Sequence, residues 1–224
     1  MAGRLYIVGT PIGNLEDITL RALRILGEVA AIACEDTRQT VKLLNRYGLQ
    51  KPLLSYFHPR EGQRIPEIIR LLKEGRDVAL VSDAGTPGIS DPGFPLIREA
   101  LKEGLLVVPV PGPSAVTTAL SAAGLPTHRF LFVGFPPPKK TGLRKFLEAL
   151  AGEDATLVFY LPTRRLTEFL GAVMELLGDR RVVVARELTK IHEEFLRGAA
   201  SELQAAVGSR TIKGEATVLV EGSH

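Results

Sequence analysis

The thirteen residues Val81–Gly93, VSDAGTPGISDPG, constrain the fold of this chain more than any other stretch. Three glycines and two prolines surround two aspartates, directly after the apolar run DVALVS, which predicts a buried strand. Glycine allows φ values that other residues avoid, and proline fixes φ while removing a hydrogen-bond donor. The pattern favours a stiff loop with exposed backbone at a strand's carboxyl end, where open α/β sheets bind ligands. A long surface turn is the plainer alternative, and it explains only part of the run.

Apolar runs alternate with helical patterns along the whole chain, which is typical of α/β proteins. In the first half we expect strands at Leu5–Gly9, Val29–Cys34, Leu53–Phe57, Asp77–Ser82 and Leu106–Val110. Their continuous apolar character predicts a largely parallel sheet covered by helices on both faces. One of these helices is expected over Ile18–Leu26, with Leu20, Leu23 and Leu26 on its buried face.

The same pattern resumes after Gly124-Leu-Pro. Further strands are expected at Phe130–Phe135, Thr156–Leu161, Val182–Ala185, Glu194–Arg197 and Ala216–Val220. We therefore expect an N-terminal α/β domain over residues 1–126 and a C-terminal α/β domain over residues 127–224.

Bulk composition bounds the function without choosing it. A chain of 224 residues that is 45% apolar can build a sizeable core, and no apolar run approaches the length of a membrane span. One cysteine and four histidines give no dense zinc-type spacing, so we predict no metal site and expect a reducing, cytoplasmic setting. The net charge of +3 and the pI near 9.1 permit nucleic acid as a partner but do not require it.

Seven blocks in order along the chain resemble the ribosomal RNA small-subunit methyltransferase I family. SDAGTPGISDPG at Ser82–Gly93 resembles the signature of that family. The other blocks are LYIVGTPIGNLEDITLRAL at Leu5–Leu23, ACEDTRQT at Ala33–Thr40, VPGPSAVTTALSAAGLP at Val110–Pro126, FVGFPP at Phe132–Pro137, ARELTKIHEE at Ala185–Glu194 and KGEATVLVEG at Lys213–Gly222. Together they cover the chain almost end to end.

This resemblance implies a fold and an activity. The family consists of S-adenosylmethionine-dependent (class III) methyltransferases with the tetrapyrrole-methylase fold, two α/β lobes with a cofactor cleft between them. The resemblance implies methylation of a cytidine ribose 2′-hydroxyl in small-subunit ribosomal RNA. It also implies a homodimer whose partner is that RNA or the assembled small subunit.

Three loops are expected to hold the cofactor. GTPIGN at Gly9–Asn14 lacks the lysine and hydroxyl of a phosphate-binding loop and the spacing of a dinucleotide fingerprint. PGPSAV at Pro111–Val116 turns a strand end into a helix, whose free N–H groups could hold a carboxylate. A simple helix cap at Ser114 is the plainer alternative, and the convergence of polar groups from several strand ends favours cofactor contact over it. By resemblance the cofactor-binding positions are Pro11, Asp83, Ala84, Gly85, Pro87, Ser114, Ala115, Leu161, Leu188 and Ala216.

Two charged segments are candidates for the acceptor side. In EDTR, Glu35 or Asp36 could accept the hydroxyl proton, whereas the plainer interpretation makes Asp36 a helix cap and Arg38 a surface residue. In RELTKIHEE, Glu187 and Lys190 could orient the hydroxyl and stabilise an alkoxide, although charge runs of this kind usually form a solvated face.

Four arginines are candidates for RNA binding, namely Arg38, Arg60, Arg164 and Arg165. Two other functions stay open at this point. A methyltransferase could act on a tetrapyrrole, whose carboxylates arginine would also bind, or on a protein side chain. A non-enzymatic RNA-binding module with a vestigial pocket is the second alternative, and the intact glycine loops argue against it.

Overall fold

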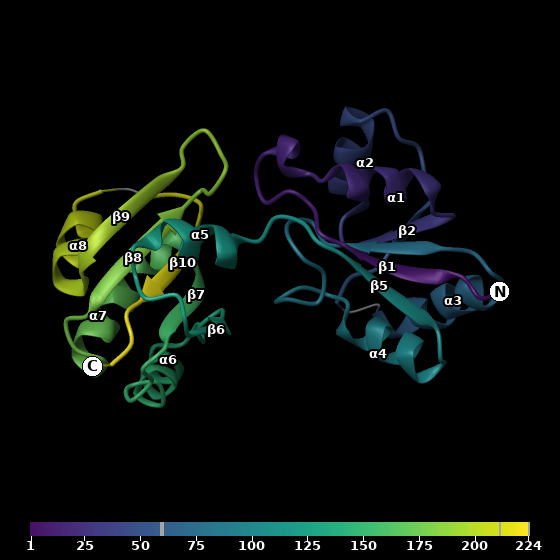
Figure 1. The fold of residues 1–224 in the computed structure, drawn as a ribbon. Coiled ribbons are helices and arrows are strands. Elements are labelled where there is room, and N and C mark those ends of the chain that lie inside the picture. Colours follow the sequence, from purple (N-terminus) through teal and green to yellow (C-terminus); the bar gives the residue numbers. More distant parts are fainter. Residues whose placement is uncertain (59–60, 211, 224) are drawn as a thin grey trace. The chain divides into compact units, whose positions relative to one another are not determined.

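Each half of the chain builds a five-stranded sheet in the computed structural model, which describes residues 1–58, 61–210 and 212–223 (Figure 1). The chain divides into two compact units, Met1–Ser114 (unit 1) and Ala115–His224 (unit 2). The predicted α/β class with two lobes is therefore confirmed for the architecture of each unit.

Unit 1 contains a parallel sheet with strand order β3-β2-β4-β1-β5. The strands are β1 (Arg4–Val8), β2 (Ala31–Cys34), β3 (Leu53–Ser55), β4 (Val78–Val81) and β5 (Leu106–Val110). The helices are η1 (Leu15–Asp17), α1 (Leu20–Glu28), α2 (Thr37–Arg46), α3 (Glu61–Lys73) and α4 (Phe94–Lys102). The parallel arrangement predicted from the apolar strands is confirmed here.

Helices cover both faces of the unit 1 sheet. Helices α1 and α2 pack on one face with Ile32 and Val81, and α3 and α4 pack on the other with Leu5 and Leu80 (Figure 1). The apolar face predicted for α1 is wrong at one position, because Leu20 is 86% exposed and the buried residues are Ala22, Ile25 and Leu26. Leu20 is the first helical residue, just after the cap Thr19, and it points away from the sheet-facing stripe.

Unit 2 has a mixed sheet with strand order β6-β7-β10-β8-β9, in which only the β6–β7 pairing is parallel. Its strands are β6 (Phe130–Gly134), β7 (Thr156–Pro162), β8 (Arg181–Arg186), β9 (Glu194–Ala199) and β10 (Glu215–Val220). Its helices are α5 (Ala115–Ala123), α6 (Lys140–Glu148), η2 (Thr163–Arg165), α7 (Leu166–Leu176) and α8 (Ala200–Gly208). The alternation of apolar runs and helices did not reveal these antiparallel pairings.

The unit boundary lies one helix earlier than the sequence suggested. Helix α5 contacts β8 and β10 of unit 2, on the face opposite to the core that α6, α7 and α8 form with the same sheet. Arg197 of β9 also donates a 2.7 Å hydrogen bond to the carbonyl of Ala122 at the end of α5. These contacts assign α5 to unit 2, whereas the predicted division placed it in the N-terminal domain.

Aromatic packing supports the unit 2 core. The rings of Phe159 in β7 and Phe169 in α7 meet edge to face with centroids 5.0 Å apart, and both are fully buried. We predict that Phe169→Ala lowers the free energy of unfolding by about 3–5 kcal/mol, because the cavity cannot close fully. Phe130→Ala, at a ring that is 46% exposed, should change it by less than about 1 kcal/mol. Urea unfolding followed by circular dichroism compares the two variants, and equal losses would contradict the packing argument.

Candidate functional site

The carboxyl ends of all five unit 1 strands lie at the same edge of the sheet, because every pairing in it is parallel. The segments that leave this edge include Gly9–Asn14 after β1, Glu35–Arg38 after β2, Ser82–Gly93 after β4 and Pro111–Ser114 after β5. These are the four segments of unit 1 that the sequence predicted as site segments, and three of them are glycine- and proline-rich loops. The parallel topology brings all four to one edge of the sheet, which is where open α/β sheets bind ligands.

Two glycines allow the loops after β1 and β5 to touch backbone to backbone. A Cβ atom on Gly9 would lie 2.9 Å from the Gly112 Cα, and one on Gly112 would lie 2.7 Å from the Gly9 carbonyl oxygen. Real Cβ atoms do not approach so closely. The two glycines are therefore required by a close approach of main chains.

The loop after β4 is joined to the loop after β1 by a backbone bridge. The Thr10 N–H donates to the Gly85 carbonyl at 2.9 Å, and the Gly85 N–H donates to the Thr10 carbonyl at 3.1 Å. The buried Thr10 hydroxyl also donates to the Ser82 carbonyl at 3.1 Å. Gly85 has φ of +83°, a value that side chains with a Cβ rarely adopt. The predicted role of glycine as a conformational requirement is confirmed at this position.

The predicted cofactor positions of unit 1 lie around this bridge. Pro11 is buried next to Thr10, and the Pro113 carbonyl and Ile12 are the nearest groups to the position of a Cβ on Gly85. Asp83 and Ala84 are exposed on the loop, Pro87 is buried, and Ser114 and Ala115 stand where the β5 loop enters α5.

Asp83 also connects this loop to the acidic segment after β2. Its carboxylate accepts a 3.0 Å hydrogen bond from the Asp36 N–H. Asp36 in turn caps α2 by accepting from the Arg38 N–H at 2.8 Å, and its two oxygens accept from the Arg38 guanidinium at 2.6–3.2 Å. These hydrogen bonds lower the pKa of Asp36 to about 2. The structure thus favours the plainer role for Asp36, as cap and ion-pair partner, over that of a proton acceptor.

Glu35 has the opposite electrostatic environment. It is half-buried, and burial together with the negative charges of Asp83 and Asp91 raises the pKa of its carboxyl above the usual 4.5. A carboxylate with a raised pKa is the stronger base. Between the two acids that the sequence left open, Glu35 is the better candidate for taking a proton.

Three predicted cofactor residues of unit 2 lie near one end of its sheet. Ala216 of β10 stands opposite Leu161 of β7 and opposite Arg186 of β8, and Leu188 follows β8 by two residues. Leu161, Leu188 and Ala216 are all buried. Leu161 and Ala216 belong to the hydrophobic core of unit 2.

Glu187 and Lys190 lie in a turn that is stabilised by contacts of their own side chains. Glu187 and Thr189 have positive φ values of 48° and 65°, which are uncommon for residues with a Cβ. The Glu187 carboxylate accepts from the Glu215 N–H at 3.2 Å and forms a 3.0 Å ion pair with Lys190. Gly214 makes this possible, since a Cβ there would lie 2.3 Å from the Glu187 carboxylate.

The charge of Glu187 is stabilised by these contacts. Partial burial would raise its pKa, but the Glu215 N–H and the Lys190 ammonium outweigh burial and hold the pKa below the usual value. The carboxylate therefore stays ionised and committed to the turn. Lys190 keeps its side chain 40% exposed and is available to a substrate.

The predicted RNA-binding arginines differ in their surroundings. Arg38 is 86% exposed although it pairs with Asp36, and Arg164 is exposed. Arg165 is only 15% exposed and donates to the carbonyls of Pro136 and Pro137 at 3.0 and 2.6 Å. Arg165 thus fixes the FVGFPP loop within unit 2, while Arg60 lies outside the described residues.

Glu61, at the start of α3, is a site residue that the sequence analysis did not single out. Its buried carboxylate accepts a 3.1 Å hydrogen bond from the N–H of Gly93, the last residue of the glycine-rich loop. No local signal reveals this contact, because the two residues are far apart in the sequence and meet only through the packing of α3 beside α4.

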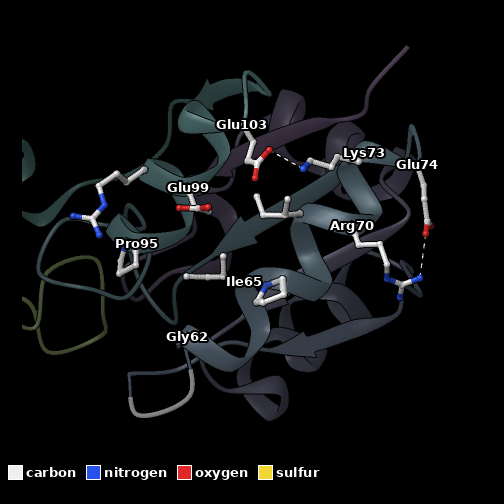
Figure 2. A pocket seen from close by; sticks show the side chains of 11 residues that line it. Gly62, Ile65, Arg70, Lys73, Glu74, Pro95, Glu99 and Glu103 are labelled. Carbon is white, nitrogen blue, oxygen red and sulfur yellow. Dashed lines mark hydrogen bonds and ion pairs between the residues drawn. The ribbon is translucent and has the colours of Figure 1, made fainter.

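A separate hollow of about 590 Å³ lies between α3 and α4 (Figure 2). Its apolar lining includes Ile65 and Pro95. On its charged rim Lys73 pairs with Glu103 at 2.6 Å and Arg70 with Glu74 at 3.1 Å. These four side chains are therefore engaged with each other.

The described residues contain no group of three or more histidine, cysteine or acidic side chains that could hold a metal ion. Within the same ranges, no helix is long and apolar enough to cross a membrane.

Comparison with known proteins identifies the family. Residues 4–204 match the family model described as Tetrapyrrole (Corrin/Porphyrin) Methylases. The ribosomal RNA small subunit methyltransferase I of Thermotoga maritima is 50% identical over 98% of this chain and 99% of its own length. That of Halalkalibacterium halodurans is 50% identical over 99% of this chain and 76% of its own.

This chain belongs to the tetrapyrrole methylase family. Among solved structures, a uroporphyrin-III-C-methyltransferase from Thermus thermophilus matches with a TM-score of 0.68 at 24% identity, covering 98% of this chain and 94% of its own. A cobalt precorrin-4 methyltransferase matches with a TM-score of 0.72 at 20% identity, covering 97% and 94%. At these identities the likeness establishes the tetrapyrrole methylase fold.

The positive φ of Gly85 gives a direct test of the loop. We predict that Gly85→Val abolishes binding of S-adenosylhomocysteine, because a branched side chain opposes φ of +83° and fills the space beside the bridge. Gly104→Val is the matched control, since Gly104 also has positive φ (+68°) but lies in the α4–β5 turn with open space around it. Calorimetry on both folded variants measures the affinity, and normal binding by Gly85→Val would show that the loop is only a turn.

Proposed function

We infer that this chain is an S-adenosylmethionine-dependent methyltransferase that methylates a cytidine ribose 2′-hydroxyl of small-subunit ribosomal RNA. The observation that carries this conclusion is identity near 50% over almost the whole chain to proteins named ribosomal RNA small subunit methyltransferase I. The convergence of the three glycine loops at one edge of unit 1 supports it independently.

The loops fit the cofactor that this function requires. Bound there, the cofactor would supply an electrophilic methyl group on a sulfonium centre. The chain's own contribution is a cradle in which Gly85 presents backbone rather than side chain, flanked by Pro11, Ala84 and Pro87. We propose that Asp83, Ser114 and Ala115 complete it. On the resemblance to the family alone, we also propose Leu161, Leu188 and Ala216 as cofactor-binding residues.

We propose that Glu35 accepts the proton of the ribose hydroxyl. A neutral hydroxyl is a poor nucleophile, and a positioned base that removes its proton during attack raises the rate. The half-buried Glu35 carboxyl has a raised pKa, whereas the low pKa of Asp36 makes its carboxylate a weak base. In this proposal Asp36 is a positioning residue rather than the base, because it holds Arg38 and contacts Asp83.

Lys190 and Glu187 have different proposed roles. The exposed ammonium of Lys190 could stabilise negative charge on the acceptor oxygen. The Glu187 carboxylate, bound to the Glu215 N–H and to Lys190, holds that ammonium in place.

The proposed partner is small-subunit ribosomal RNA or the assembled subunit, contacted by Arg38 and Arg164, and the proposed setting is the bacterial cytoplasm. We also propose a homodimer, on the resemblance to the family alone. A tetrapyrrole acceptor is the alternative that the fold permits, but the solved tetrapyrrole enzymes share only 20–24% identity with this chain.

The choice between the two acids can be tested by amide substitution. We predict that Glu35→Gln lowers the single-turnover rate of methyl transfer by at least about 10²-fold, the lower end of general-base contributions. Asp36→Asn should cost less than about tenfold, because asparagine also caps helices. S-adenosylhomocysteine affinity, measured in parallel, should be unchanged in Glu35→Gln.

The same assay has a pH signature. In the parent enzyme the rate should fall as pH drops through the Glu35 pKa, at a pH above the usual glutamate value of 4.5, because protonation removes the base. Glu35→Gln should lose this inflection. An unchanged profile in that variant would assign proton acceptance to another group.

Two neighbouring arginines provide a matched pair for RNA binding. We predict that Arg164→Gln weakens binding to small-subunit RNA and flattens its salt dependence by about one phosphate contact, roughly 0.7–0.9 in log–log slope. Arg165→Gln should lower thermal stability instead, since its guanidinium holds two carbonyls of the FVGFPP loop. Filter binding across salt concentrations distinguishes them, and a flatter slope only for Arg165→Gln would reverse the assignment.

A further inference from the structure

Glu61 is a buried acid whose carboxylate reaches the glycine-rich loop. Its side chain is 9% exposed at the first residue of α3, and its Oε1 accepts a 3.1 Å hydrogen bond from the Gly93 N–H. Its Oε2 lies 3.6 Å from Nδ1 of His58, whose ring is exposed. A buried carboxylate is costly unless it is hydrogen-bonded, and the contact with Gly93 supplies one such hydrogen bond to Glu61.

A contact that holds Gly93 also constrains the second half of the Val81–Gly93 loop. Its φ of +146° and its surroundings exclude a side chain, since a Cβ would lie 3.1 Å from both the Gly88 N atom and Leu80 Cδ2. The Gly88 N–H donates to the Pro92 carbonyl at 3.2 Å, which closes the turn between them. A group that holds Gly93 therefore also sets the position of Gly88.

The same contact supports the start of α4. Gly93 is the N-cap residue of α4 and has no side chain with which to cap it. The negative charge of Glu61 lies at this helix N-terminus, where the helix dipole favours an anion. Glu61 thus connects the beginning of α3, the beginning of α4 and the end of the loop.

The structure describes three contacts that hold the loop, and they are made by segments that follow β1, β2 and β3. Thr10 bridges Gly85 at its beginning, and the Asp36 N–H contacts the Asp83 carboxylate. In the part of the chain that the structure describes, Glu61 provides the side-chain hydrogen bond to the loop's last residue. Without it, the segment between Gly85 and Gly93 would lose this side-chain hydrogen bond at its end.

We propose that Glu61 is a positioning residue for the cofactor loop, whose carboxylate sets the loop conformation that binds S-adenosylmethionine. The inference rests on the proposed function, because it assigns the Val81–Gly93 loop to that cofactor. The decisive property is the length of the side chain, because it must carry the carboxylate from α3 to the Gly93 N–H.

Two substitutions of Glu61 separate the effect of side-chain length from the effect of charge. Glu61→Gln keeps the length and an acceptor oxygen, whereas Glu61→Asp keeps the charge and is one methylene shorter. Glu61→Asp should weaken S-adenosylhomocysteine binding by about 10- to 100-fold, the range of a lost hydrogen bond to a charged group. Glu61→Gln should weaken it by less than about fivefold, because a neutral acceptor gives a hydrogen bond of roughly half the strength.

Asp77→Ala is the matched control for a general loss of stability. Its carboxylate accepts from the Arg4 N–H at 2.7 Å in the same unit, but it precedes β4 and so lies at the opposite edge of the sheet. This variant should melt at a lower temperature and bind S-adenosylhomocysteine like the parent. Calorimetry is run below the melting temperature of every variant, and equal weakening in Asp77→Ala would overturn the proposal.

Hydrogen exchange gives a readout that does not depend on any variant folding. In the parent protein the Gly93 amide should exchange slowly, and S-adenosylhomocysteine should slow it further. Exchange of that amide at the rate of an unprotected one would overturn the proposal. If the parent bound no S-adenosylhomocysteine at all, the proposed function would fail as well, whereas normal binding by Glu61→Asp would remove only the role of Glu61.

Discussion

The contact between the main chains of Gly9 and Gly112 is the constraint on which the site depends. Strands β1 and β5 are neighbours in a parallel sheet, so the loops that follow them leave the same edge side by side. Their separation is set by a glycine on each side, because any Cβ would come within 3 Å of the other backbone. Thr10, next to Gly9, then pairs with Gly85. This close approach therefore places Thr10 where it can hold the beginning of the Val81–Gly93 loop.

Three acidic residues near this edge have distinct tasks that their hydrogen bonds define. Asp83 accepts from the Asp36 N–H, Asp36 accepts from Arg38, and Glu61 accepts from the Gly93 N–H. These three carboxylates hold backbone or a cation and are satisfied by it. Glu35 is the acid whose pKa is raised. Acids of similar appearance in the sequence are thus divided by their contacts into those that build the site and one suited to chemistry.

The sequence predicted most of the elements and the convergence of the loops, since both depend on local pattern and on strands ending at one edge. It could not predict what depends on packing between distant segments. The antiparallel pairings of unit 2 and the assignment of α5 to that unit follow from which strands become neighbours. The structural role of Arg165 and the contact of Glu61 with Gly93 likewise connect residues that are far apart along the chain. Asp36 was predicted only in part. The sequence showed its capping pattern, but not that the hydrogen bonds of the cap and of Arg38 lower the pKa of Asp36.

Crowding of acids at the proposed RNA-facing site is unfavourable by itself, because phosphates are repelled by carboxylates. The hydrogen bonds of Asp36 with Arg38 offset part of this negative charge. The remaining negative charge acts on Glu35, whose pKa is raised by burial and by the charges of Asp83 and Asp91. A base works best when its pKa approaches the operating pH, so a raised pKa improves the match to a hydroxyl donor. The acids that fix the loops therefore also raise the pKa of Glu35, the carboxylate proposed to accept a proton.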